Sequence, residues 1–362
     1  MTSATVIANA DDLASICDEL AQAPALALDT EFMRERTYRA ELCLVQVANH
    51  REAWCIDPIA LKGIGLFATV LANNQTLKVL HAARQDLEVL ATVATPLTNV
   101  FDTQVAASLA GFPAQVGYAD LVQRLLGVEL TKGQTRTDWS RRPLSAAQVD
   151  YARDDVRYLL PLRDLLSETL EKLGRSGWLA EELQALSDPR QLAVDPQRAW
   201  VRLKGMQGLD GARESLLRSL AAWRETRAIE RNRPRGWILD DNLLKDIVFT
   251  VPRSMQQLAS LEGMTEGLLA HSGDELLTRV RAAEIPEPPP PLPKREKPDP
   301  LFVALTRKLT DYTQAVAKEI GIAPEVLATR RDIEALARGQ SACALSCGWR
   351  QEVIGAKLTA LL

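Results

Sequence analysis

The segment 24–32 reads Pro-Ala-Leu-Ala-Leu-Asp-Thr-Glu-Phe, an apolar run that ends in two carboxylates. Its alanines and leucines predict a buried strand over Ala25–Thr30. Side chains two positions apart in a strand point to the same face, so Asp29 and Glu31 should project together from the strand end. Burying two repelling carboxylates is costly unless a cation compensates, and a divalent metal is the simplest such cation. The alternative is that Asp29 caps the next turn and Glu31 lies in solvent.

The composition is that of an ordinary globular protein. Its 362 residues, 46% of them hydrophobic and 25% charged, predict two or three domains with a sizeable core. The net charge of −4 argues mildly against a nucleic-acid binder, although the charge is unevenly distributed. The sequence shows no CxxC pair, no secretory signal and no apolar run near the ~20 residues of a membrane span. We therefore expect a cytoplasmic protein that does not bind membranes.

Strand and helix patterns alternate through the first 170 residues. The expected strands are Ala25–Thr30, Leu42–Ala48, Glu52–Ile56, Leu77–His81 and Asn99–Asp102. The expected helices are Leu66–Leu71, Gln85–Val93, Thr103–Ala110, Tyr118–Leu126 and a long one that begins at the N-cap Ser145 and ends near Leu173. The early strands are close in sequence, as antiparallel hairpins require, and helices separate the later ones. This pattern predicts an α/β domain, a mixed sheet covered by helices.

The strand signal disappears after residue 190, and the rest of the chain has helical patterns. A spacer with eight prolines in sixteen residues, 285–300, interrupts them and predicts an extended, semi-rigid segment. We therefore predict an α/β domain over 1–205, a helical domain over 206–284, the spacer over 285–300 and a second helical domain over 301–362.

Further acidic residues follow at two later places. Asp86 falls in the first turn of a helix, where the helix dipole alone would explain an acid. Tyr151 and Asp155 are four apart and share one helix face, while Asp150 and Asp154 share the adjacent face. We expect one pair to face inward, with Asp155 at the edge of the apolar stripe. The alternative is an exposed helix on which neighbouring arginines balance the charge.

Asp29, Glu31, Asp86 and Asp155 could converge with Tyr151 at one sheet edge. Four carboxylates suit a pair of divalent cations about 3.5–4 Å apart. Such a pair activates a water molecule and stabilises a leaving oxygen on phosphorus.

Four stretches carry a family resemblance: DTEF, LHAARQDLEVL, FDTQ and DWSRRPLSAAQVDYARDDVRYLLPL. They resemble the exonuclease motifs of the DEDD superfamily, tyrosine subclass, and the order of the whole chain is similar to the ribonuclease D family. That resemblance implies a 3′–5′ exonuclease domain with a ribonuclease-H-like fold over 1–205. It also implies HRDC (helicase and RNase D C-terminal) domains over 206–284 and 301–362. Asp102 in FDTQ matches a family position, but we expect it to cap the next helix.

The resemblance implies a role for each of the five residues. Asp29 would bridge two Mg²⁺ or Mn²⁺ ions, Glu31 and Asp155 would complete one metal site, and Asp86 would support the second. Tyr151 would position the attacking water or help to deprotonate it. We favour positioning, because an unperturbed tyrosine has a pKa near 10.

The resemblance also implies the substrate: RNA with a free single-stranded 3′ end, cut to nucleoside 5′-monophosphates by a monomer. Transfer-RNA precursors and small structured RNAs are the family's substrate class. From the residues, Phe32 could stack on the terminal base or lie in the core. The basic residues around Trp139 could contact phosphates, or Trp139 could anchor a solvated loop. These basic residues are Lys132, Arg136, Arg141 and Arg142.

The segment 223–237 holds five arginines against two glutamates, despite the acidic total. Arg227 and Arg231 of this segment are candidates for RNA binding, and a solvated helix face is the alternative.

Two other functions compete with an exoribonuclease. A DNA 3′–5′ exonuclease of repair type would differ only in its contacts to the 2′-hydroxyl, which the sequence does not locate. A catalytically silent RNA-binding scaffold is disfavoured, because a scaffold does not need four repelling carboxylates.

Overall fold

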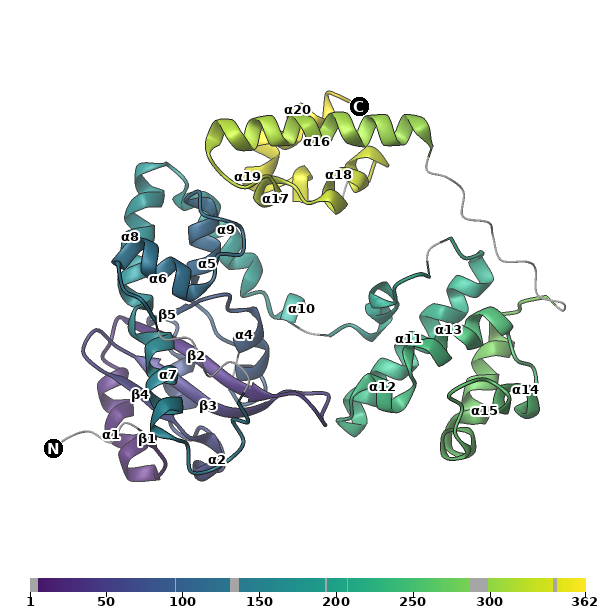
Figure 1. Cartoon of the computed structure of the whole chain (residues 1–362), viewed down its shortest axis with the longest axis horizontal. Helices are drawn as coiled ribbons and strands as arrows, with labels where there is room; N and C mark the ends of the chain where they lie inside the picture. The colour runs from purple at the N-terminus through teal and green to yellow at the C-terminus, as the bar shows by residue number, and fades with distance from the viewer. Residues whose placement is uncertain are drawn as a thin grey trace. The chain divides into compact units, whose positions relative to one another are not determined.

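The computed structural model describes residues 6–94, 96–130, 137–192, 194–206, 208–286, 299–340 and 344–362. The chain divides into two compact units. The first unit comprises Met1–Met33, Leu42–Leu192 and Pro298–Leu362, and the second comprises Arg34–Glu41 and Ala193–Lys297. Each unit is described by itself below (Figure 1).

A six-stranded sheet forms the centre of the first unit, in the order β1-β4-β3-β2-β5-β6. The strands are β1 (Val6–Ile7), β2 (Ala25–Met33), β3 (Glu41–Ala48), β4 (Ala53–Ile56), β5 (Leu77–Leu80) and β6 (Val100–Asp102). β2 pairs with β5, β5 with β6 and β1 with β4 in parallel, whereas β3 and β4 are antiparallel. The predicted mixed sheet is therefore confirmed. The short β1 was not predicted, because two residues carry no periodicity.

Helices cover both faces of this sheet (Figure 1). The helices up to residue 192 are α1 (Ala10–Leu20), α2 (Pro58–Leu61), α3 (Phe67–Ala72), α4 (Arg84–Leu90), α5 (Thr103–Leu109), α6 (Tyr118–Leu126), α7 (Ala146–Arg157), α8 (Leu159–Lys172), α9 (Ser176–Leu186) and α10 (Pro189–Leu192). Leu26 and Leu28 of β2 belong to the core shared with α1, α3 and α4. Ala25 and Ala27 point the other way, into the core formed with α5, α6 and α8. β2 is thus buried on both faces.

The prediction of one long helix from Ser145 to Leu173 is wrong, because the chain forms α7 and α8 with a break at Tyr158. Pro161 cannot donate a backbone hydrogen bond to the preceding turn, so it fits only near the start of a new helix. The backbone N–H of Tyr158 instead donates to the hydroxyl of Tyr118, 3.2 Å away. The predicted N-cap is confirmed, since Ser145 forms a capping box with Gln148.

The C-terminal segment of the first unit is a helical module packed against α9. Its helices are α16 (Pro300–Ile320), α17 (Pro324–Leu327), α18 (Arg330–Ala337), α19 (Gly348–Arg350) and α20 (Ala356–Thr359). The Trp349 ring stacks on that of Trp178, with centroids 4.4 Å apart, and its indole N–H donates to Glu182 at 2.8 Å. The core of this module is continuous with the core around α5 and α8.

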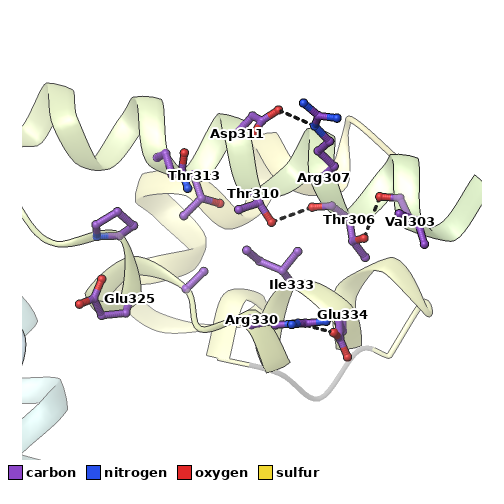
Figure 2. Close-up of a pocket in the computed structure, with 13 residues that line it drawn as sticks. Val303, Thr306, Arg307, Thr310, Asp311, Thr313, Glu325, Arg330, Ile333 and Glu334 are labelled. Atoms are coloured by element: carbon purple, nitrogen blue, oxygen red, sulfur yellow. Dashed lines mark hydrogen bonds and ion pairs between the residues drawn. The ribbon is translucent and has the colours of Figure 1, made fainter. Parts of the chain in front are cut away.

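A groove of about 480 Å³ lies between α16 and the α17–α18 segment (Figure 2). The arginines along it are already paired: Arg307 lies 4.0 Å from Asp311, and Arg330 lies 2.8 Å from Glu334. The hydroxyl of Thr310 donates to the carbonyl of Thr306, one turn earlier on the same helix. The groove is therefore not a basic surface.

The described part of the second unit contains a 3₁₀ helix, five α-helices and the arm Arg34–Glu41. The helices are η1 (Pro196–Arg202), α11 (Gly211–Arg231), α12 (Arg235–Ile238), α13 (Asp241–Thr250), α14 (Met255–Ala259) and α15 (Glu266–Ala282). Side chains of Asp210, Asp240, Ser254 and Thr265 cap the starts of α11, α13, α14 and α15. Leu216, Leu220 and Leu244 are fully buried in its core.

The predicted spacer over 285–300 lies mostly outside the described residues. The predicted domain boundaries and the second HRDC assignment for 301–362 stay predictions. None of the described helices has the length and hydropathy needed to cross a membrane.

Candidate active site

The strand β2 carries the first two acids of the site. Asp29 and Glu31 continue the face of Ala25 and Ala27, which is the face that α7 and α8 cover. The strand pairs with β5 through Ala27 and Val79, so its acidic end lies beside the loop that leaves β5. β2 therefore places Asp29 and Glu31 near the loop that leads from β5 to Asp86.

Asp86 lies in the first turn of α4, as predicted. Asp86 is 7% exposed, and its carboxylate accepts a hydrogen bond of 2.5 Å from the Thr30 hydroxyl. Thr30 stands between the two acids of β2 but points to the opposite face, toward α4. Sequence reasoning missed this residue, because a threonine between two acids carries no signal of its own.

Asp102 fixes the start of α4. Its carboxylate caps α5 by accepting from the N–H of Gln104 and Val105, which confirms the predicted capping role. It also accepts from the N–H of Ala82 at 3.1 Å and of Ala83 at 2.8 Å, directly before α4. Asp102 therefore stabilises the turn before α4 and so orients Asp86.

The helix α7 supplies the remaining two residues. Tyr151 and Asp155 are both half-buried and lie one helical turn apart, close enough for the Tyr151 phenol to lower the pKa of Asp155 against the effect of burial. On the adjacent face, Asp150 is exposed and Asp154 pairs with Arg157 at 2.9 Å. Asp155 is therefore the inward-facing acid.

The four carboxylates interact electrostatically. Burial and then the charges of Asp86, Asp155 and Glu31 raise the pKa of Asp29 well above its usual range. Burial and the charges of Asp155 and Asp86 raise the pKa of Glu31 to about 8. Burial raises the pKa of Asp86 to about 6 and that of Asp155 to about 7, while hydrogen bonds from Thr30 and Tyr151 oppose these shifts.

This donor set fits divalent cations. Among the described residues, the charged neighbours that shift the four pKa values are all carboxylates rather than cations. Across the described residues, however, no three His, Cys, Asp or Glu side chains already form a cage around one position. The two observations agree physically, because charges interact over distances well beyond a coordination bond and repelling carboxylates stand apart without a cation.

Three residues proposed to contact substrate lie in the segment before α7. Trp139 is only 3% exposed and packs on Tyr151 with ring centroids 6.2 Å apart, which favours the anchoring alternative. The guanidinium of Arg142 donates to both carboxylate oxygens of Asp57, at 2.5 and 2.9 Å, and to the carbonyl of Cys43. Arg142 is therefore a structural cation. Arg141 is exposed and pairs with Asp138 at 3.0 Å.

Lys132 and Arg136 lie outside the described residues. Phe32 is half-buried and does not pack into any hydrophobic cluster of the described chain. This position suits an aromatic platform better than a core residue.

In the second unit, Arg227 and Arg231 line a polar pocket of about 310 Å³. Arg227 is paired with Glu275 at 2.9 Å, whereas Arg231 is exposed. The ring of Trp237, 59% exposed, also lines this pocket, and the guanidinium of Arg233 lies 5.7 Å from its centre. The pocket thus presents an accessible aromatic face beside cations.

Comparison with known proteins assigns the family. A model of the 3′–5′ exonuclease family matches residues 4–171, and a model of the HRDC domain matches residues 213–280. Ribonuclease D of Sphingobium indicum is 38% identical, over 97% of this chain and 92% of that protein. Ribonuclease D of Gluconacetobacter diazotrophicus is 39% identical, over 98% of this chain and 92% of that protein. The chain belongs to the ribonuclease D family.

The fold agrees with this membership. The crystal structure of Escherichia coli RNase D, described as an exoribonuclease involved in structured RNA processing, matches with a TM-score of 0.84 at 32% identity. The match covers 99% of this chain and 98% of that one. The predicted family, fold and 3′–5′ exoribonuclease activity are confirmed, and RNA is the substrate. Exonucleases of this family generally use divalent metal ions.

Proposed function

We propose that Asp29, Glu31, Asp86 and Asp155 bind two divalent ions, Mg²⁺ or Mn²⁺, and that Tyr151 orients the attacking water. The observation that supports this most strongly is the mutual electrostatic destabilisation of the four carboxylates, one buried and three half-buried, whose charged neighbours among the described residues are themselves carboxylates. When bound, the two ions would lower the pKa of the water and stabilise the leaving oxygen.

The reaction is hydrolysis of the last phosphodiester bond of a free single-stranded 3′ end. The water oxygen bonds to phosphorus, and the bond between phosphorus and the 3′ oxygen of the preceding nucleotide breaks. The products are a nucleoside 5′-monophosphate and a chain that is one nucleotide shorter with a new 3′-hydroxyl. Burial and the charges of Asp155 and Glu31 raise the pKa of Tyr151 above its ordinary value, so Tyr151 keeps its proton and acts by orientation.

We propose transfer-RNA precursors and other small structured RNAs as substrates, bound by a monomer. The description of the E. coli relative as an enzyme of structured RNA processing supports this class. Phe32 would stack on the terminal base, because its half-buried ring is not committed to a core cluster of the described residues.

The pocket around Trp237 in the second unit is proposed as an accessory RNA contact. Aromatic faces stack on any base, and an adjacent arginine neutralises phosphate. Trp237 and Arg231 are exposed and line the same pocket, which suits one unpaired nucleotide.

The deciding experiment digests a 3′-extended transfer RNA and a DNA oligomer of the same 3′ sequence with Mg²⁺ or Mn²⁺. We expect stepwise shortening of the RNA, with nucleoside 5′-monophosphates as products. Equal or faster digestion of the DNA would favour the repair exonuclease, and nucleoside 3′-monophosphates would contradict the proposed bond cleavage.

A further inference from the structure

The arm Arg34–Glu41 connects β2 to β3 in the sequence but packs as part of the second unit. β2 carries Asp29 and Glu31, and the arm begins directly after its last residue, Met33. The arm is therefore a covalent extension of the strand that bears the proposed metal ligands.

The first anchor of this arm is Tyr38. Its hydroxyl donates to Oε1 of Glu225 on α11, a residue that is fully buried. Arg235 and Arg202 lie 3.6 and 3.8 Å from the same carboxylate. The ring of Tyr38 packs against the hydrophobic core of the second unit. Burial and the Glu225 carboxylate raise the pKa of Tyr38 above its ordinary value, so the phenol stays a donor.

A second anchor follows immediately. The backbone N–H of Arg39 donates to Oδ1 of Asn232 at 3.0 Å. Asn232 ends α11 with φ +46°, so the anchor is on the same helix as Glu225. Two consecutive arm residues held on one helix fix both the position and the direction of the arm.

Release of the arm would be unfavourable. Among the described residues, Tyr38 alone donates a hydrogen bond to the Glu225 carboxylate, and Oε2 of that carboxylate has none. When a buried carboxylate loses its hydrogen-bond donor, the cost of removing its charge from water is no longer offset. The hydrogen bond between Tyr38 and Glu225 should therefore remain formed in the folded protein.

We infer that Tyr38 and Glu225 form a latch through which the second unit positions β2, and with it Asp29 and Glu31, for RNA hydrolysis. This inference rests on the proposed metal site. Tyr38 and Glu225 act through β2, so they are positioning residues. The second unit would then contribute to the chemical step as well as to RNA binding, because small displacements of reacting groups lower rates steeply.

The test is Tyr38→Phe in the full-length protein, with Tyr312→Phe as the matched control. Tyr312 is a half-buried tyrosine in the C-terminal module. For Tyr38→Phe we expect kcat on single-stranded RNA to fall about tenfold or more, with KM changed less than about twofold. The thermal stabilisation by Mn²⁺ should also shrink. Wild-type kcat in folded Tyr38→Phe would overturn the latch.

Asn232→Gly provides a variant that keeps the fold if Tyr38→Phe does not. Glycine adopts the positive φ of this exposed position freely, so only the hydrogen bond to the arm is removed. We expect a smaller fall in kcat at unchanged KM, and an unchanged kcat would overturn the latch.

Asp29→Asn, assayed in parallel, separates the latch from the metal site. An active Asp29→Asn refutes the site assignment. An inactive Asp29→Asn beside a fully active Tyr38→Phe refutes the latch alone. Glu225→Leu, which leaves no acceptor for the Tyr38 hydroxyl, combined with Tyr38→Phe should be no slower than Glu225→Leu alone, because both substitutions remove the same hydrogen bond; a further loss in the double variant would refute the pairing.

Discussion

At the scale of single residues, burial and three other carboxylates act against the charge of Asp29 in the metal-free protein. The folded pKa values of Glu31, Asp86 and Asp155, about 8, 6 and 7, all exceed the ordinary values of 4.5, 3.8 and 3.8. The folded state therefore binds more protons than the unfolded state between about pH 4 and pH 8. In that window the free energy of unfolding of the metal-free protein decreases as pH rises.

Asp29→Asn should stabilise the metal-free protein at pH 8 and flatten this pH dependence. One pKa unit corresponds to about 1.4 kcal/mol, so we expect a gain of at least about 1 kcal/mol. Thermal unfolding in chelator from pH 5 to pH 8 measures it, with the exposed Asp18→Asn as the control. A lower melting temperature for Asp29→Asn than for wild type would contradict the proposed repulsion.

The places of the four proposed metal-binding acids in the fold could be predicted from sequence, because each lies in a motif at a strand end or on a helix. Thr30 and Asp102 show the limit of that reasoning. Thr30 donates to Asp86 from a residue 56 positions earlier, and Asp102 holds Ala83 from 19 positions later. Such contacts depend on how β2, β5 and β6 pair, which no local pattern encodes.

At the scale of elements, the break between α7 and α8 depends on Pro161 and on the hydroxyl of Tyr118. The Tyr118 hydroxyl donates to the carbonyl of Asp154 at 2.9 Å and accepts from the N–H of Tyr158 at 3.2 Å. The helical period predicted both segments, but the break is set by Pro161 together with this contact from α6. Most strand bounds were predicted to within a residue or two, since burial on both faces gives continuous apolar runs.

Tyr118→Phe should weaken the end of α7 that carries Asp155. The substitution removes two hydrogen bonds of part-buried backbone groups, which costs about 1–3 kcal/mol. We expect a lower melting temperature together with a lower kcat. An unchanged melting temperature and an unchanged midpoint of denaturant-induced unfolding would contradict this stabilising role of the hydroxyl.

At the scale of the whole molecule, each of the two compact units is built from segments that are not contiguous in the sequence. Residues 298–362 pack with the first unit and the arm Arg34–Glu41 packs with the second. Sequence patterns gave no sign of either, because both depend on contacts between distant segments. A deletion of 206–362 would therefore remove the partners of Trp178 and Tyr38 as well as the accessory RNA pocket, so point substitutions test RNA binding more cleanly.

Two exposed arginines allow such a test. Arg231 lines the pocket beside Trp237, whereas Arg307 lies in the groove of Figure 2, where Asp311, Glu325 and Glu334 outnumber the two arginines. Arg231→Ala should weaken RNA binding and reduce the slope of log K against log salt by about one. Arg307→Ala should leave the slope unchanged. Equal slopes for Arg231→Ala and wild type would contradict an RNA contact at this pocket.

The most direct test of the metal site is calorimetric titration of the full-length, metal-free protein with Mn²⁺ at pH 6 and pH 8. The proposed site predicts two ions per chain, tighter binding at pH 8, and proton release visible as a buffer-dependent heat. Asp29→Asn should lose at least one ion. Wild-type stoichiometry and affinity in Asp29→Asn, or no Mn²⁺ binding by the wild-type protein even with RNA present, would contradict the assignment of these four carboxylates.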